Sequence, residues 1–314
     1  MSPLQIVLLC LLGLAVLGFA ASYYAMCIAC RRTRRLTENL DAAIQSATLS
    51  RHAPQLREGI DWFRRQPTEA ISVHSFDGLL LHGELLRREN ARGSVILFHG
   101  WRSAGLLDFS CGLKMYYEMG LNLLLVDQRA HGRSEGRFIT YGVRERRDVQ
   151  SWVERHNQAL GAELPVLLGG LSMGATTVLM ACGLPLPKNV KGVIADCGFT
   201  SPYEIIRKVI GDRKLPKAPV AAMIGLQTRL FAGFGLKECS TTAALAENRL
   251  PTLLVHGEGD AFVPCEMSRR AYEACAAEDK TLLTVPQAGH GQSYLVQPER
   301  YRAVLSAFVD RALA

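Results

Sequence analysis

The chain has 314 residues, 48% of them apolar, and a formal net charge of +7. This length and composition allow one large hydrophobic core, with or without an appendage. The basic residues form no long tract interleaved with aromatic side chains, which argues against a nucleic-acid-binding protein. Their densest cluster, RRTRR at 31–35, directly follows an apolar segment, so the charge points to a membrane surface instead.

The amino-terminal segment from Leu4 to Cys30 contains no charged residue. About 20 apolar residues in a helix are enough to cross the hydrocarbon core of a bilayer. A cleaved signal peptide is the alternative, but it would have a basic start and an apolar run of only about 7–15 residues. We expect an uncleaved transmembrane anchor over residues 1–30, with Tyr23 and Tyr24 at the interface and the large domain on the cytoplasmic side.

The nine cysteines show no metal-like spacing except at Cys27 and Cys30, and no second pair completes a zinc site. These two positions weakly resemble a lipid-attachment box, but Cys27 stands where that box needs a leucine. We expect free or buried thiols in a reducing compartment.

Residues 31–68 are polar and rich in arginine, with a thin apolar stripe. We interpret them as a juxtamembrane helical linker that need not pack strongly. The stripe consists of Leu36, Leu40, Ile44, Ile60 and Phe63.

After Pro67 the pattern changes to short apolar runs alternating with helical segments. Two alternating runs around Asp77 and Gly78 predict a hairpin. The later runs are almost continuously apolar, which indicates a mostly parallel sheet covered by helices on both faces. They occupy residues 93–100, 121–129, 164–172, 190–198, 251–260 and 280–286.

The alternation stops between Phe199 and Leu250. This stretch predicts two helices separated by a proline-rich joint, inserted into a single α/β domain. Its apolar face includes Val220, Met223, Ile224, Leu230 and Phe231.

The sequence Gly170-Leu171-Ser172-Met173-Gly174 lies where an apolar run ends and a helical pattern begins. It is no phosphate loop, because such a loop needs lysine followed by serine or threonine after the last glycine, and no dinucleotide fingerprint is present. A G-x-S-x-G turn between a strand and a helix holds its serine in a strained conformation, with small residues two positions to either side. The motif therefore predicts Ser172 as a nucleophile.

A serine nucleophile needs a base, and the base needs an orienting acid. With this motif the chain order is serine, acid, histidine. Asp260 follows the apolar run after Pro251, and His290 lies in a glycine-flanked loop after the last run. Asp260 as an ordinary turn residue is the alternative, and Glu258 and Asp196 are competing acids. The histidines in other glycine-rich turns, where structural hydrogen bonding is the default, are His99, His131 and His256.

Acyl transfer places negative charge on a carbonyl oxygen, which needs two backbone N–H donors. Met173, directly after the predicted nucleophile, supplies one of them. Trp101, just past His99 and Gly100, is the candidate for the other. Arg102 could steer an anionic substrate, although a solvated loop arginine is the simpler interpretation.

Five stretches, HGWRSAG, VDQRAHGRSEG, GLSMGA, HGEGDAFVP and AGHG, resemble in sequence and order the signatures of the α/β-hydrolase family. The resemblance runs from Ile71 to the carboxyl terminus and is to the serine aminopeptidase and lysophospholipase-like branch. SFDGLLLHG, DCGFTSPYEI and the amino-terminal span are further similar to single-span hydrolases of bacteria and eukaryotes. One scaffold turn departs from the family pattern, because Ala130 replaces a glycine.

The resemblance implies an α/β-hydrolase fold over residues 69–314. It also implies Ser172 as nucleophile, Asp260 as acid, His290 as base and the amides of Trp101 and Met173 as oxyanion hole, with no metal or organic cofactor. Residues 199–250 would form a cap over the site, with packing helices as the alternative.

The implied activity is hydrolysis of an ester or thioester, on a small-molecule acyl ester or lipid-like substrate, through an acyl-enzyme. The alternatives are an aminopeptidase-like amide hydrolase and a non-catalytic membrane scaffold.

Overall fold

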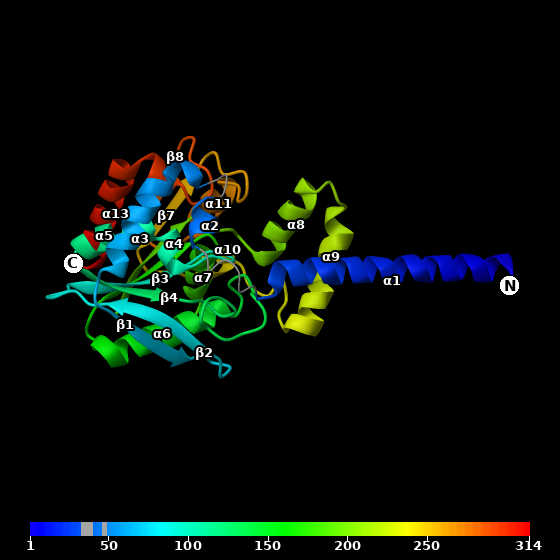
Figure 1. Cartoon of the computed structure of the whole chain (residues 1–314), viewed down its shortest axis with the longest axis horizontal. Helices are drawn as coiled ribbons and strands as arrows, with labels where there is room; N and C mark the ends of the chain where they lie inside the picture. The colour runs from blue at the N-terminus through cyan, green and yellow to red at the C-terminus, as the bar shows by residue number, and fades with distance from the viewer. Residues whose placement is uncertain (33–39, 46–48) are drawn as a thin grey trace.

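The computed structural model describes residues 1–32, 40–45 and 49–314. The arginine cluster beyond Arg32 and Leu36 of the predicted linker lie outside these residues. The first helix, α1 (Pro3–Cys30), projects from one end of the molecule, and the carboxyl terminus lies at the opposite end (Figure 1). By length and composition, α1 is the one helix in the described parts of the chain that could cross a membrane.

The centre of the molecule is an eight-stranded sheet in the order β1-β2-β4-β3-β5-β6-β7-β8. β2 is antiparallel to both of its neighbours, and all other pairs are parallel, so the predicted mostly parallel sheet is confirmed. Gly78 turns the β1–β2 hairpin with a φ of +85°. The strands are β1 Thr68–His74, β2 Leu80–Leu86, β3 Gly93–Phe98, β4 Leu121–Val126, β5 Val166–Leu171, β6 Val190–Asp196, β7 Thr252–Gly257 and β8 Lys280–Val285.

Helices cover both faces of this sheet, because its central strands are apolar on both sides. Every residue of β3, β4 and β7 is buried. On one face Trp152 and Val178 pack against the strands, and on the other Phe63, Leu113 and Phe308 do so. The helices of the first face are α6 Glu145–Leu160, α7 Met173–Ala181 and α11 Glu266–Ala274; those of the second are α3 Ala53–Arg64, α5 Ser110–Glu118 and α13 Pro298–Ala312.

The predicted linker packs on the domain more firmly than its polar sequence indicates. It contains α2 (Leu40–Ile44), η1 (Ser50–His52) and α3, which lies against α5. Leu56, Ile60 and Phe63 are buried, because they form the apolar stripe of α3. This helix of the predicted linker therefore packs on the domain, which its sequence did not require.

The insert forms helices that lie beside α1 (Figure 1). α8 (Pro202–Asp212) and α9 (Lys217–Gln227) are separated by the predicted proline-containing joint, and α9 continues into a π-helical turn, η2 (Thr228–Ala232). α9 contacts both α8 and α1. A short helix, α10 (Thr241–Leu245), then leads back to the sheet.

Candidate active site

Ser172 stands on a tight turn between β5 and α7, with a φ of +55° and a ψ of −113°. The glycines on either side have no room for a side chain. A Cβ on Gly174 would lie 1.7 Å from the carbonyl oxygen of Phe98, and one on Gly170 would lie 2.3 Å from the backbone of Gly174. Close backbone packing therefore requires glycine at both positions, as the motif predicts.

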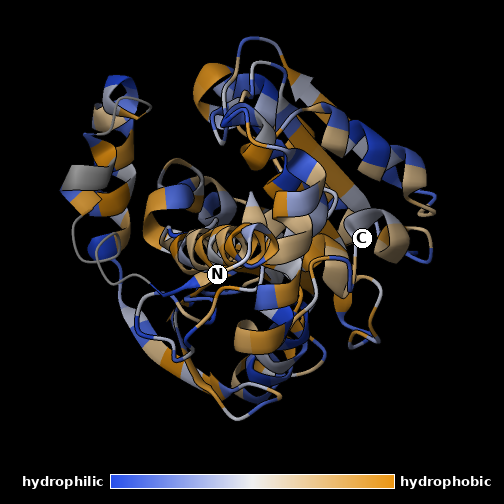
Figure 2. Ribbon diagram, turned by 90° about the vertical axis from the view of Figure 1, so that its right-hand side faces the viewer, coloured by the Kyte–Doolittle hydropathy of each residue, from blue (hydrophilic) through white to orange (hydrophobic). Residues whose placement is uncertain are grey.

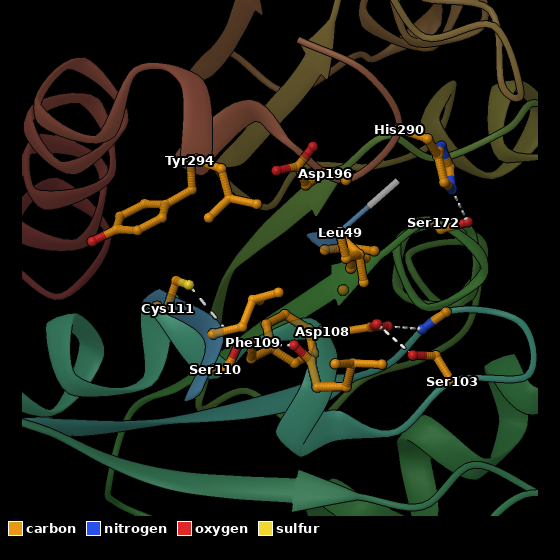
Figure 3. Close-up of a pocket in the computed structure, with 18 of the residues that line it drawn as sticks. Leu49, Ser103, Asp108, Phe109, Ser110, Cys111, Ser172, Asp196, His290 and Tyr294 are labelled. Atoms are coloured by element: carbon orange, nitrogen blue, oxygen red, sulfur yellow. Dashed lines mark hydrogen bonds between the residues drawn. The ribbon is translucent and has the colours of Figure 1, made fainter. Parts of the chain in front are cut away.

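The structure brings Ser172, His290 and Asp260 together, although they are far apart in the sequence. The Ser172 Oγ lies 2.9 Å from His290 Nε2, and His290 Nδ1 lies 2.7 Å from Asp260 Oδ2. Figure 3 shows the imidazole of His290 directed at the hydroxyl of Ser172. A carboxylate only accepts hydrogen bonds, so Nδ1 carries the proton and Nε2 is free to accept one from the hydroxyl.

Asp260 is buried and fully hydrogen-bonded. Its Oδ1 accepts the backbone N–H groups of Phe262 and Val263 at 2.9 and 2.8 Å, and His256 Nε2 lies 3.2 Å from Oδ2. Burial alone would raise the pKa of Asp260, but hydrogen bonds from His256 and His290 outweigh it and hold the pKa well below its usual value. The carboxylate is therefore charged at neutral pH.

The other histidines and the competing acids have structural partners. His256 Nδ1 lies 2.7 Å from the Ser268 hydroxyl, and the backbone N–H groups of Gln128 and Arg102 donate to Nε2 of His99 and His131. Glu258 is exposed and pairs with Arg269, whereas Asp196 is buried and accepts a hydrogen bond from Ser293. None of these groups contacts the Ser172 hydroxyl in the part of the chain that the structure describes.

The loop after β3 contains one backbone N–H, that of Trp101, without a hydrogen-bond acceptor among the described residues. The Gly100 N–H donates to Asp108 Oδ2 at 2.6 Å, and the Arg102 N–H donates to His131 Nε2 at 3.0 Å. Within the described residues the Trp101 N–H between them has no acceptor. Met173 is the first residue of α7, so its N–H has no acceptor within the helix. Both N–H groups named as oxyanion donors are thus free to bind a ligand atom.

The end of α1 holds this loop in place. The indole Nε1 of Trp101 donates to the Ala29 carbonyl at 2.9 Å, and the Tyr141 hydroxyl donates to the same oxygen at 3.0 Å. The Arg102 guanidinium donates to the Ile28 carbonyl and stacks on the Trp101 ring. The last carbonyls of a helix lack partners within it and carry partial negative charge, so these donors complete its end.

A cavity of about 540 Å³ opens beside Ser172 and His290, and its lining is mostly apolar (Figure 3). Most of the lining comes from the loop after β3, from α4 (Gly105–Asp108), from α5 and from α12 (Ser293–Val296). Leu49 and Leu56 of the predicted linker also line it. No residue of 199–250 does so among those described, so the expected cap contributes nothing to this lining.

Two carboxyl groups in this cavity, the partly buried Asp108 and the buried Asp196, were not singled out from the sequence as pocket residues. Asp108, at the end of α4, accepts hydrogen bonds from the Gly100 N–H and the Ser103 hydroxyl. Burial raises its pKa, and these hydrogen bonds offset only part of the rise. Burial likewise raises the pKa of Asp196. The available signal for Asp108 was a lone acid within an apolar helical segment.

Cys197, Asp260 and His290 place one possible metal ligand each within 4.8 Å of one another. Burial raises the pKa of the Cys197 thiol well above its usual value, and a protonated thiol is a poor ligand. The Asp260 carboxylate is already occupied by its hydrogen bonds. The arrangement fits a hydrogen-bonded chain better than a metal centre.

A mostly parallel eight-stranded sheet with a serine on the turn between β5 and the following helix has the architecture of the α/β-hydrolase fold. The model of the alpha/beta hydrolase family matches residues 95–304, which is more than half of the chain. The chain therefore belongs to the alpha/beta hydrolase family.

Individual relatives are distant. The chain is 24% identical to protein YqkD of Bacillus subtilis over 79% of this chain and 81% of the relative. It is 25% identical to a monoacylglycerol lipase of Mycolicibacterium smegmatis, over 70% of this chain and 90% of the lipase. The esterase Pf2001 of Pyrococcus furiosus superposes with a TM-score of 0.65 at 21% identity, covering 79% of this chain and 92% of the esterase.

Proposed function

We propose that the protein is a serine hydrolase that cleaves carboxylic ester or thioester bonds through Ser172, His290 and Asp260. The observation that carries this proposal is the hydrogen-bonded chain from the Ser172 hydroxyl to the Asp260 carboxylate, at the edge of an apolar cavity. The monoacylglycerol lipase among the relatives supports an ester as the substrate.

The geometry suits a two-step reaction. His290 Nε2 takes the proton of Ser172 as its Oγ bonds to the carbonyl carbon, and the N–H groups of Trp101 and Met173 bind the oxyanion. His290 returns the proton to the leaving group, whose bond to the carbonyl carbon breaks, and an acyl-enzyme remains. Water then attacks, with His290 again as the base, and releases the carboxylic acid.

A fluorophosphonate probe on the full-length chain tests the nucleophile. We expect the wild-type protein to be labelled, Ser172→Ala to lose the label, and Ser240→Ala, which alters only the amino-terminal cap of α10, to keep it. An unlabelled wild-type protein would support the non-catalytic scaffold. Labelling that survives in Ser172→Ala would place the nucleophile elsewhere.

Amide hydrolysis is the second candidate, because a carboxyl group lies in the cavity near the nucleophile. A Cβ on Gly100 would lie 3.2 Å from Asp108 Oδ2 and 3.4 Å from Ser172 Cβ, so Asp108 and Ser172 flank Gly100. An ionised Asp108 would pair with a substrate ammonium group, as an aminopeptidase-like enzyme needs. Faster turnover of amino-acid amides than of acyl esters, with KM for the amides raised in Asp108→Asn, would favour this candidate.

We further propose that α1 is a retained single-pass anchor (residues 1–30), followed by a juxtamembrane segment (31–68) and a cytoplasmic hydrolase domain (69–314) with its insert at 199–250. Met26 and Cys30 support retention, because both are buried against the domain. Protease treatment of intact cells tests the topology. Digestion of the large domain from outside would overturn a cytoplasmic location.

A further inference from the structure

The insert and α1 form a joint surface near the middle of α1. Gln227, at the end of α9, is buried, and its amide donates to the Phe19 carbonyl at 3.0 Å and to the Ser22 hydroxyl at 2.8 Å. The rings of Tyr23 and Phe231 pack edge to face, with centroids 5.0 Å apart. The insert therefore touches α1 along residues 18–23, well before the helix ends at Cys30.

This contact sets the depth of the insert in a bilayer. The free part of α1, residues 3–17, is only about 22 Å long at about 1.5 Å per residue. The hydrocarbon core is about 30 Å thick, so a spanning α1 needs about 8 Å more of its length inside the core. That length is the stretch from Gly18 to Tyr23, which the insert contacts on one side. Tilting α1 would deepen the overlap further.

The insert carries exposed apolar side chains. Outside residues 1–30, the described part of the chain has six exposed large apolar residues, and four of them belong to residues 215–231. Leu230 is the most exposed of the four, at 64%. Figure 2 looks along α1 from its amino-terminal end and shows this apolar helix end-on in front of the molecule. The four residues, here called the apolar rim, are Leu215, Leu226, Leu230 and Phe231.

The charges around the apolar rim fit a lipid surface. From Arg213 to Lys237 the sequence has five basic residues and no acidic one. Lysine and arginine extend their charged ends toward lipid headgroups while their stems lie in apolar surroundings. A second protein could also bind the apolar rim. A membrane-spanning α1, however, places this side of the molecule next to lipid.

We propose that the apolar rim, which runs from the α8–α9 joint through α9 to η2, inserts into the near leaflet of the membrane beside α1, so that the catalytic domain lies against the bilayer through two contacts. This proposal rests on the proposed membrane span of α1. It does not depend on the chemistry at Ser172.

Tryptophan depth measurements on the full-length chain test it. Three variants are each reconstituted in vesicles of phosphatidylcholine with phosphatidylglycerol. They are Leu230→Trp in the apolar rim, Leu14→Trp in the exposed part of α1, and Ala314→Trp at the opposite end of the molecule. The lipids carry bromine either near the headgroup end or near the methyl end of their acyl chains. Subtracting the wild-type signal removes the contribution of the three native tryptophans.

We expect bromine near the headgroup to quench Leu230→Trp more strongly than bromine near the methyl end, at a depth of about 5–10 Å below the headgroups. Leu14→Trp should be quenched by both lipids, and Ala314→Trp by neither. If Leu14→Trp is quenched and Leu230→Trp behaves like Ala314→Trp, the leaflet contact is overturned. If Leu14→Trp also escapes quenching, the membrane span fails with it. Neither failure changes fluorophosphonate labelling of Ser172, which reports on the proposed hydrolase separately.

Discussion

Replacing Asp260 by asparagine tests the proposed hydrogen-bonded chain from Ser172 through His290 to Asp260. Both backbone N–H groups that bind this side chain, those of Phe262 and Val263, donate to Oδ1. The carbonyl oxygen of an asparagine must therefore take the place of Oδ1. Its NH₂ group then takes the place of Oδ2, which lies 2.7 Å from His290 Nδ1 in the wild type.

An NH₂ group facing Nδ1 reverses the tautomer of His290. Nδ1 would have to accept a hydrogen bond, so the imidazole proton would move to Nε2, where it points at the Ser172 hydroxyl. Nε2 could then no longer take the proton of the nucleophile. We expect kcat to fall by about 10⁴-fold while the geometry of the site is retained. A serine–histidine–acid triad whose histidine has the wrong tautomer loses activity of this order.

The assay is turnover of a p-nitrophenyl acyl ester by the purified full-length protein, with circular dichroism as the check on folding. Glu258→Gln is the matched control, because it makes the same change of carboxylate to amide two residues earlier, on an exposed side chain that pairs with Arg269. Its kcat should stay close to that of the wild type. Folded Asp260→Asn that keeps more than about a tenth of wild-type kcat would refute Asp260 as the orienting acid.

Three further predictions concern the loop, the surface and the turn. Trp101→Phe keeps the backbone N–H but removes the indole bond to the end of α1, so we expect kcat to fall about three- to ten-fold with KM nearly unchanged. The pKa of Asp77 is lowered to about 2. Partial burial alone would raise this pKa, but hydrogen bonds from Arg129 outweigh the effect of burial. Asp77 therefore stabilises the fold above about pH 4, and this stabilisation is lost as pH falls toward 2. In urea titrations, Asp77→Asn should therefore lower the free energy of unfolding by about 1–2 kcal/mol at pH 7, discounted for partial exposure, and by almost nothing near pH 2. Gly174→Ala should prevent folding or cost at least about 3 kcal/mol, seen as loss of folded protein, whereas Gly13→Ala, with open space around it, should cost nothing.

The sequence predicts the site better than it predicts the surroundings of the site. Ser172, Asp260 and His290 each follow an apolar run, and parallel strands bring their carboxyl ends to one edge of a sheet. Placing the three residues near one another therefore needs only the strand assignments and the chain order. Their hydrogen bonds depend on loop conformations, such as the positive φ of Ser172, which the motif indicates but does not determine.

The position of the insert could not be predicted in the same way. An apolar stripe on a helix shows that one face is buried, but it does not name the partner of that face. Ile224 and Gln227 are buried, and the insert packs beside α1 and away from the cavity. Leu56, by contrast, comes from a sequence that looks like a solvated linker and lines the cavity. Both outcomes depend on contacts between segments far apart in the chain.

The contacts at the end of α1 connect the proposed anchor to the proposed chemistry. A free helix end in water would leave the Ala29 carbonyl to solvent, but here Trp101 and Tyr141 both donate to it. Trp101 is also the residue whose backbone N–H is free to bind an oxyanion, so one residue joins the loop that would stabilise charge to the helix that would cross the membrane. The position of that N–H relative to Ser172 therefore depends on α1 as well as on the sheet. For this reason the carboxyl-terminal end of α1 is a structural part of the candidate site, even though no atom of α1 needs to touch the substrate.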